Sequence, residues 1–244
     1  MDFTGKLAVV TGVASGIGRA VALELAAAGA TVIAADRDLD GAKRTAELAT
    51  GAIEPHFLDV TDPAAVLALR EDVVARHGAP NVLVNAAGWD RIAPFLDGDE
   101  EFWHALVEIN YLGQVRMTKA MLEPMLADGG RIVNLASDAG RVGSSGESVY
   151  AGAKGGVIAF TKSVAREVAR HGITVNCVCP GPTDTPLFAA QPEKIRLALV
   201  KAIPLRRLAT PEEVAAAVTF FASDRAAFVT GQVLSVSGGL TMAG

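Results

Sequence analysis

The fold is decided by the stretch from 7 to 18, which reads LAVVTGVASGIG and joins a short apolar run to a glycine-rich turn. The apolar run predicts a buried strand, and the alanine-rich residues that follow predict a helix. Gly12 permits a tight turn, while Gly16 and Gly18 lack the Cβ atoms that would keep the backbone away from a phosphate. The helix N-terminus attracts a pyrophosphate, and Ser15 can donate a further hydrogen bond. Such glycines also occur in purely structural turns, but the strand and helix around them favour dinucleotide binding.

The same alternation of strand and helix continues along the chain. Alanine-rich segments with helical periodicity separate the apolar runs, and the stretches Thr61–Pro63 and Thr210–Glu213 are typical of helix starts. We therefore expect an α/β fold of Rossmann type, with a doubly wound parallel sheet of about seven strands and helices on both faces. The expected strands are Leu7–Val10, Thr31–Ala35, Ile53–Leu58, Val82–Val84, Ile132–Leu135, Thr174–Val178 and Val233–Val236.

Length and composition indicate one NAD-binding domain over residues 1–244, because half of the residues are apolar and no linker interrupts them. A proline-rich loop and a lid-like helix are expected from about 181 to 204, over the carboxyl edge of the sheet. The net charge of −5, without a basic stripe, argues against nucleic-acid binding. We find no secretory signal or membrane span, so we expect a cytoplasmic protein.

The cysteines and histidines predict no metal centre. Cys177 and Cys179 are the two cysteines of the chain, and the four histidines are scattered along it. The two cysteines alternate along an expected strand, so both side chains should face one packed layer and not act as reactive thiols.

Acidic and small residues follow the expected strands. A carboxylate at Asp36 can accept hydrogen bonds from both adenosine ribose hydroxyls and repels a 2′-phosphate, which favours NAD over NADP. The alternative is a solvated corner residue, and the adjacent Arg37 could itself receive a 2′-phosphate. Residues Asp59 and Val60 are expected beside the adenine. The turn Asn85-Ala86-Ala87-Gly88 is expected to line the adenosine and ribose.

Tyr150 and Lys154 form the candidate catalytic pair. They are four residues apart at the start of an expected helix and therefore share one helix face. Small residues around them let a flat ligand approach, which favours a site over a surface pair. A phenol titrates near pH 10, and an ammonium roughly 5 Å away favours the phenolate by about 3 kcal/mol at an effective dielectric near 20. Tyr150 is therefore the candidate acid/base, with Lys154 as electrostatic partner and as a hydrogen-bond donor to the nicotinamide ribose.

Two polar residues could complete this site. Ser137 ends the fifth expected strand, where its hydroxyl could steady a carbonyl or alkoxide oxygen or simply cap a turn. Asn110 lies inside a helical pattern, where asparagine is mildly unfavourable. It is either an exposed helix residue or the holder of a water that links Lys154 to solvent.

Together these residues resemble the short-chain dehydrogenase/reductase family, in its short single-domain branch, over nearly the whole chain. The resemblance implies hydride transfer between a nicotinamide cofactor and an alcohol/ketone pair, with Tyr150 as acid/base, Ser137 holding the substrate oxygen and Lys154 anchoring the cofactor. It implies a water-holding Asn110 and a homotetramer. It also implies cofactor contacts from Ile17 and from the segment that follows the sixth strand, through Pro180, Gly181, Thr183 and Thr185. The motifs that carry it are Thr11-Gly-x-x-x-Gly16-x-Gly18, Asp59-Val60, Asn85 to Gly88, Asn110, Ser137, Tyr150-x-x-x-Lys154 and Asn176-x-x-x-Pro180-Gly181.

Two positions depart from the family pattern. Ala86 stands where a second asparagine is usual, and Ser237 stands where an acid usually precedes two glycines. The first departure should leave cofactor binding intact, and the second concerns C-terminal packing and not the chemistry.

A narrower resemblance concerns the substrate. Residues 85–90 and 137–147 are similar to those of 2-hydroxycyclohexanecarboxyl-CoA dehydrogenases, which implies an NAD-linked cyclic hydroxyacyl-CoA substrate. Trp89 would then face an apolar ring, and Arg141 or Arg91 would meet CoA phosphates. The alternatives are a 3-oxoacyl-carrier-protein reductase that uses NADPH, against which Asp36 argues, and a non-catalytic NAD-sensing or scaffold protein, which would not need Ser137, Tyr150 and Lys154.

Overall fold

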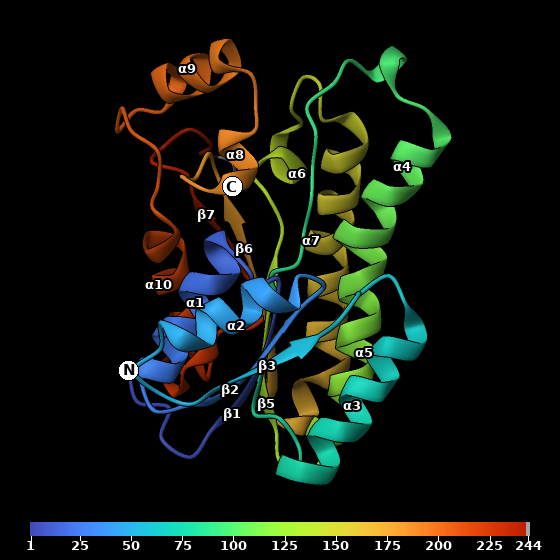
Figure 1. The fold of residues 1–244 in the computed structure, drawn as a ribbon, viewed down its shortest axis with the longest axis vertical. Helices are drawn as coiled ribbons and strands as arrows, with labels where there is room; N and C mark the ends of the chain where they lie inside the picture. The colour runs from blue at the N-terminus through green and yellow to red at the C-terminus, as the bar shows by residue number, and fades with distance from the viewer. Residues whose placement is uncertain (243–244) are drawn as a thin grey trace.

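The chain forms one twisted sheet between two layers of helices, as a computed structural model that describes residues 1–242 shows (Figure 1). All seven strands are parallel and lie in the order β3-β2-β1-β4-β5-β6-β7, which confirms the expected Rossmann-type fold. Each strand stands at one of the seven expected runs. The strands are β1 (Leu7–Thr11), β2 (Thr31–Asp36), β3 (Ile53–Phe57), β4 (Val82–Asn85), β5 (Gly130–Leu135), β6 (Ile173–Pro180) and β7 (Val233–Val236).

Helices cover both faces of the sheet because apolar residues line the strands on both sides. The longer helices are α1 (Gly16–Ala27), α2 (Leu39–Glu47), α3 (Pro63–His77), α4 (Glu100–Val107), α5 (Gly113–Met125), α7 (Ser148–Val168), α9 (Glu193–Ala202) and α10 (Pro211–Ala222). The short ones are α6 (Ala139–Val142), α8 (Pro186–Ala189), the π-helical η2 (Glu108–Leu112) and the 3-10 turns η1 (Phe95–Asp97), η3 (Ala169–His171) and η4 (Asp224–Ala226).

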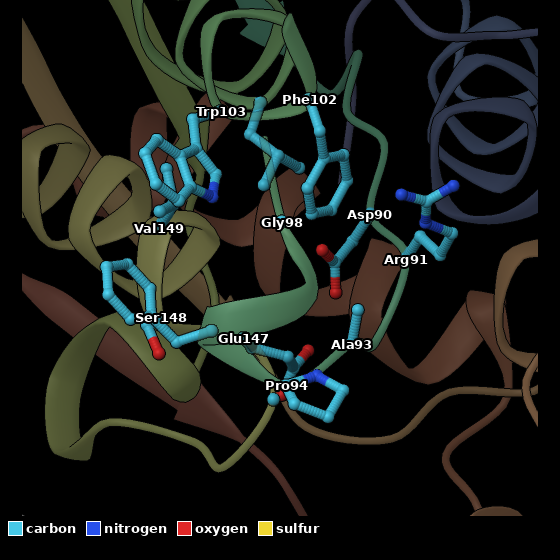
Figure 2. Close-up of a pocket in the computed structure, with 13 residues that line it drawn as sticks. Asp90, Arg91, Ala93, Pro94, Gly98, Phe102, Trp103, Glu147, Ser148 and Val149 are labelled. Atoms are coloured by element: carbon cyan, nitrogen blue, oxygen red, sulfur yellow. The ribbon is translucent and has the colours of Figure 1, made fainter. Parts of the chain in front are cut away.

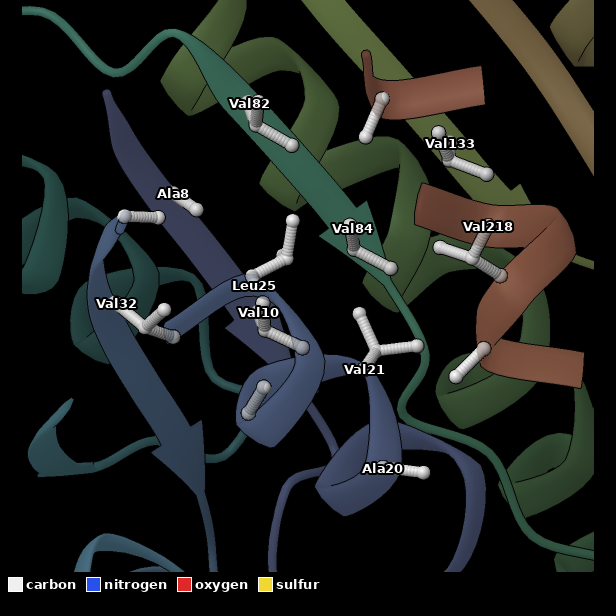
Figure 3. Close-up of a cluster of buried hydrophobic side chains, with 14 of the residues drawn as sticks. Ala8, Val10, Ala20, Val21, Leu25, Val32, Val82, Val84, Val133 and Val218 are labelled. Atoms are coloured by element: carbon white, nitrogen blue, oxygen red, sulfur yellow. The ribbon is translucent and has the colours of Figure 1, made fainter. Parts of the chain in front are cut away.

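Two large apolar cores hold these layers together. On one face, α1 and α10 pack against the sheet, and Figure 3 shows Leu25 and Val218 from these helices beside Val10 and Val84 from the strands. On the other face, α3, α5 and α7 bury the three methionines Met117, Met121 and Met125. The carboxyl ends of the strands therefore all meet one edge of the sheet, where α/β folds bind ligands.

Two helix starts confirm what their sequences predict. The Asp62 side chain accepts a hydrogen bond from the backbone of Ala64, with Pro63 in the first turn of α3. Thr210 and Glu213 form a reciprocal capping box at the start of α10. These caps satisfy backbone N–H groups that a helix would otherwise leave unpaired.

The segment after β6 contains the two helices α8 and α9, which lie beyond the carboxyl end of β6 (Figure 1). Within β6, the Sγ atoms of Cys177 and Cys179 are 4.0 Å apart and both thiols are buried in the same layer, as expected. Within residues 1–242, none of the helices is long and apolar enough to cross a membrane.

Candidate active site

The glycine-rich turn forms a cradle between β1 and α1. Gly12 and Gly16 have φ angles of +75° and +56°, which residues with a Cβ rarely adopt. A Cβ on Gly18 would lie 2.1 Å from the Gly12 carbonyl oxygen. Ser15 is the N-cap of α1, yet its side chain makes no capping hydrogen bond, and the first turn has no acidic residue. The cradle therefore presents free donors and close backbone to an anionic ligand.

A pocket beside this cradle collects the residues expected to hold adenosine. Asp36, Asp59 and Val60 line it together with Gly12, Ala87 and Trp89. The Asp36 carboxylate accepts hydrogen bonds of 2.9 Å from the backbone N–H groups of Ala14 and Asp38, so it is fixed at the end of β2. Hydrogen bonds from Thr61 lower the pKa of Asp59. A pocket with a fixed carboxylate next to a glycine cradle fits a nicotinamide dinucleotide.

The turn after β4 is ordered by a threonine to which the sequence reasoning gave no role. The Thr11 hydroxyl accepts hydrogen bonds of 3.1 Å from the backbone N–H groups of Ala86 and Ala87. The Asn85 side chain is buried and donates to Thr118 and Asn134. Asn85 therefore ties β4 to its neighbours through its side chain, and Ala87 and Gly88 are the residues of this turn that line the pocket.

The three expected catalytic groups converge at the carboxyl end of β5. Ser137 follows β5, and its hydroxyl hydrogen-bonds with Tyr150 and accepts from the backbone of Ala139 at 3.1 Å. The Lys154 Nζ lies 5.7 Å from the centroid of the Tyr150 ring. This Nζ is buried and donates a 2.9 Å hydrogen bond to the carbonyl oxygen of Leu135, the last residue of β5. The sequence thus correctly predicts that the three groups lie together.

The proton affinity of Tyr150 differs from the expectation. Burial raises the pKa of the phenol above its ordinary value, as do the negative charges of Asp90 and Glu147, and the hydrogen bond with Ser137 opposes this increase. Burial also lowers the pKa of Lys154 to about 8. The expected lowering of the Tyr150 pKa is therefore wrong for the protein alone, because burial and the two nearby carboxylates disfavour the phenolate.

The Leu135 carbonyl has a second donor. Gln114 lies in α5, four residues after Asn110 in the chain, and its Nε2 donates a 2.9 Å hydrogen bond to the same oxygen. Gln114 is buried and was not singled out from the sequence. The carbonyl that holds Lys154 thus accepts from two neighbouring helices, α5 and α7.

Asn110 is fully buried in the π-helical segment η2 and is not an exposed helix residue. Its side chain accepts from the Trp89 N–H at 3.2 Å and donates to the carbonyls of Trp89 and Leu106 at 2.6 and 3.0 Å. A Cβ on Gly88 would lie 3.0 Å from the Asn110 Oδ1 and 3.4 Å from the Lys154 Nζ. Gly88 therefore lets the asparagine approach the lysine, and the water-holding role stays a prediction.

The segment after β6 returns to the glycine cradle. A Cβ on Gly16 would come within 3.1 Å of the Thr185 Cγ2, and the Thr185 hydroxyl caps α8. Thr183 donates to the Gly181 carbonyl at 2.9 Å. Gly181 itself packs against Ser237, which is buried. Of the residues in this connection, Thr185 lies beside the cradle, and the cofactor contacts of Pro180, Gly181, Thr183 and Thr185 stay predictions.

The two candidate substrate residues come from different segments of the chain. The Trp89 ring packs edge-on against Phe102, with centroids 5.8 Å apart, and Trp89 also lines the pocket of Asp36. Arg141 lies on α6, and its positive charge acts on the Cys179 thiol. A second pocket is lined by Asp90 and Glu147 and by apolar residues of α4 (Figure 2). Asp90 and Glu147 end the two stretches, 85–90 and 137–147, that carry the substrate resemblance, and the sequence predicted no role for either acid.

Comparisons with known proteins agree over nearly the whole chain. A family model described as Enoyl-(Acyl carrier protein) reductase matches residues 12–241. Proteins named 3-oxoacyl-(acyl-carrier-protein) reductase FabG from Thermotoga maritima and Escherichia coli K12 are 42% and 40% identical, over 99% of this chain and 100% of theirs. A crystal structure described as ribose-5-phosphate isomerase from Brucella melitensis 16M has a TM-score of 0.92 at 40% identity, and the match covers 100% of this chain and 95% of that one.

Proposed function

The chain belongs to the short-chain dehydrogenase/reductase family, and on that basis we propose that it interconverts a 3-oxoacyl thioester and the corresponding 3-hydroxyacyl thioester with NAD(H). Members of this family act on CH–OH groups with a nicotinamide cofactor. The observation that carries the proposal is the convergence of Ser137, Tyr150 and Lys154 at the strand end beside the glycine cradle.

The relatives support the thioester as substrate class. Those reported above are named for a 3-oxoacyl group on a carrier protein, so they favour the 3-oxoacyl alternative over the cyclic hydroxyacyl-CoA substrate. The cyclic substrate stays a prediction from residues 85–90 and 137–147. The homotetramer and the cytoplasmic location also stay predictions.

Asp36 supports NAD as the cofactor. Its carboxylate is oriented by two backbone N–H groups and lines the pocket beside the cradle, where it would accept from ribose hydroxyls and repel a 2′-phosphate. The first turn of α1 with Ser15, Gly16 and Ile17 would hold the pyrophosphate. A bound nicotinamide supplies or accepts the hydride.

The chain's own residues move the proton. During reduction, the Tyr150 Oη donates its proton to the substrate oxygen, and the Ser137 hydroxyl holds that oxygen by a hydrogen bond. During oxidation, the Tyr150 phenolate removes the proton from the alcohol. The Lys154 ammonium favours that phenolate, and the Leu135 carbonyl keeps the ammonium in place. Positioned proton transfer of this kind contributes about 10²- to 10⁴-fold to rate.

The test is a substrate panel with NADH, NADPH and their oxidised forms. The panel contains 3-oxoacyl groups on coenzyme A and on acyl carrier protein, a cyclic 2-hydroxyacyl-CoA and simple secondary alcohols. We expect the fastest turnover with a 3-oxoacyl thioester and NADH. A wild-type protein that binds NADH but turns over no substrate would support the scaffold alternative.

The matched variants are Tyr150→Phe and Tyr111→Phe, which alter the two tyrosines of the chain in turn. Tyr150→Phe should keep NADH binding, measured by fluorescence, and lose about 10²-fold or more of its turnover because no phenol transfers the proton. Tyr111→Phe should remain active. Turnover retained by Tyr150→Phe would remove the acid/base assignment.

A further inference from the structure

Two acidic side chains meet beside Tyr150 and have no part in the mechanism above. Asp90 belongs to the loop after β4, and Glu147 is the N-cap residue of α7, the helix that carries Tyr150 and Lys154. Figure 2 shows the two carboxyl groups turned toward each other at the pocket that both residues line. Their side chains are in hydrogen-bond contact.

Backbone contacts hold the two acids face to face. The Asn110 amide binds both the N–H and the carbonyl of Trp89, the residue directly before Asp90. The Ala93 N–H donates to the carbonyl of Gly146, the residue directly before Glu147, at 3.0 Å. These hydrogen bonds hold the backbones of Asp90 and Glu147 close to each other, so that the two side chains can meet.

The surroundings of Asp90 disfavour a second negative charge. Asp90 is 7% exposed, and among residues 1–242 its Oδ1 has no hydrogen-bond partner. The α4 residues at this pocket, Phe102, Trp103 and Leu106, are uncharged. The ionisable groups that act on Asp90 from α7 and its cap are Glu147 and Lys154, and Asp90 in turn acts on Tyr150.

From its own loop, the Arg91 N–H donates to Asp90, while the Arg91 guanidinium stacks on the Phe102 ring at 4.4 Å. Burial and the Glu147 carboxylate raise the pKa of Asp90 to about 7. Two carboxyl groups in contact cannot both ionise readily, so this arrangement favours keeping a proton between them.

Building on the proposed function, we propose that Asp90 and Glu147 share one proton and that this pair sets the proton affinity of the Tyr150 phenol. When the shared proton leaves to solvent, the pair changes from one negative charge to two beside Tyr150. The phenol then holds its own proton more tightly. Loss of the shared proton therefore opposes alcohol oxidation, which needs the phenolate, and supports carbonyl reduction, which needs the phenol. Asp90 and Glu147 are thus positioning residues that act through Tyr150.

The experiment compares Asp90→Asn and Glu147→Gln with Asp97→Asn, which removes an exposed carboxylate from η1. All three are made in a Tyr111→Phe background, so that Tyr150 is the single tyrosine. The ultraviolet absorbance of tyrosinate reports the ionisation of Tyr150 against pH, without substrate or cofactor. We expect the two pair variants to ionise at lower pH than the parent, by about one unit or more, the size that a nearby like charge exerts. Asp97→Asn should match the parent.

Infrared spectroscopy tests the shared proton itself. The parent should show a protonated-carboxyl band that disappears as the pH rises through about 7, and in each pair variant the remaining carboxyl group should lose its proton at a lower pH than in the parent. A parent without the band, or a Tyr150 that ionises no earlier in the pair variants, overturns the proposal. If Asp90→Asn does not fold, as judged by circular dichroism, the partly exposed Glu147→Gln decides the question. Neither readout needs turnover, so an enzyme inactive on 3-oxoacyl thioesters would refute the proposed function alone.

Discussion

Replacing Lys154 with methionine removes the positive charge and keeps a side chain of similar volume. The Lys154 Nζ lies 5.7 Å from the centroid of the Tyr150 ring. At that distance, a unit charge favours the phenolate by about 3 kcal/mol at an effective dielectric near 20, which corresponds to about two pH units or a hundredfold in phenolate population. We therefore expect Lys154→Met to oxidise alcohols about a hundredfold more slowly at neutral pH.

The pH dependence sharpens this prediction. Burial lowers the pKa of Lys154 to about 8, so the ammonium is present below that pH and is lost above it. The wild type should therefore exceed the variant by the full factor below pH 8, and the ratio should shrink as the pH rises further. Initial rates of NADH formation, measured by absorbance from acidic to alkaline pH at saturating cofactor, give this ratio directly.

The matched control is Lys162→Met, which removes an exposed ammonium from the same helix and should leave the profile unchanged. A ratio between wild type and Lys154→Met that is the same at every pH would refute the electrostatic argument. It would show that Lys154 acts only by holding the cofactor.

Two further variants test the cofactor cradle. Asp36→Ala should narrow the preference for NAD over NADP in initial rates, by about tenfold for each ~1.4 kcal/mol of lost interaction. The control Asp40→Ala removes a neighbouring acid on α2 and should leave the preference unchanged. An unchanged preference in Asp36→Ala would show that Asp36 is only a solvated corner residue. Gly18→Ala should weaken dinucleotide binding, measured by calorimetry, and lower the thermal midpoint because the new Cβ would lie 2.1 Å from the Gly12 carbonyl oxygen. The control is Gly152→Ala on α7, where a Cβ meets no atom within 4 Å. It should instead stabilise the helix by up to about 1 kcal/mol. Equal thermal unfolding midpoints for the two glycine variants would contradict the predicted clash at Gly18.

The sequence predicts those features that local patterns determine. The central strands are largely buried apolar runs, which could be located from the sequence. Right-handed connections limit the possible strand orders but do not fix the observed one. The common face of Tyr150 and Lys154 follows from helical spacing alone. The glycine-rich turn could be predicted because its conformation requires glycine. Two of its glycines have positive φ angles, and the third packs against a backbone carbonyl.

Other features depend on tertiary contacts and could not be predicted. The direction of the Tyr150 pKa shift is set by burial and by Asp90, which is far from it in the sequence. The apolar periodicity around Asn110 continues smoothly and does not reveal the π-helical turn that buries this side chain. The contact between Asp90 and Glu147 joins two loops that no local pattern connects.

The anchor of the catalytic ammonium is a main-chain oxygen, which has a consequence for how the site tolerates mutation. Both Lys154 and Gln114 bind the carbonyl of Leu135, and every residue type at position 135 would retain that carbonyl. Substitution there can alter the ammonium only by shifting the strand terminus itself, through a side chain of the wrong size for the apolar layer. A substitution at Leu135 therefore leaves the acceptor of Lys154 chemically unchanged. It would affect catalysis only if it displaced the end of β5.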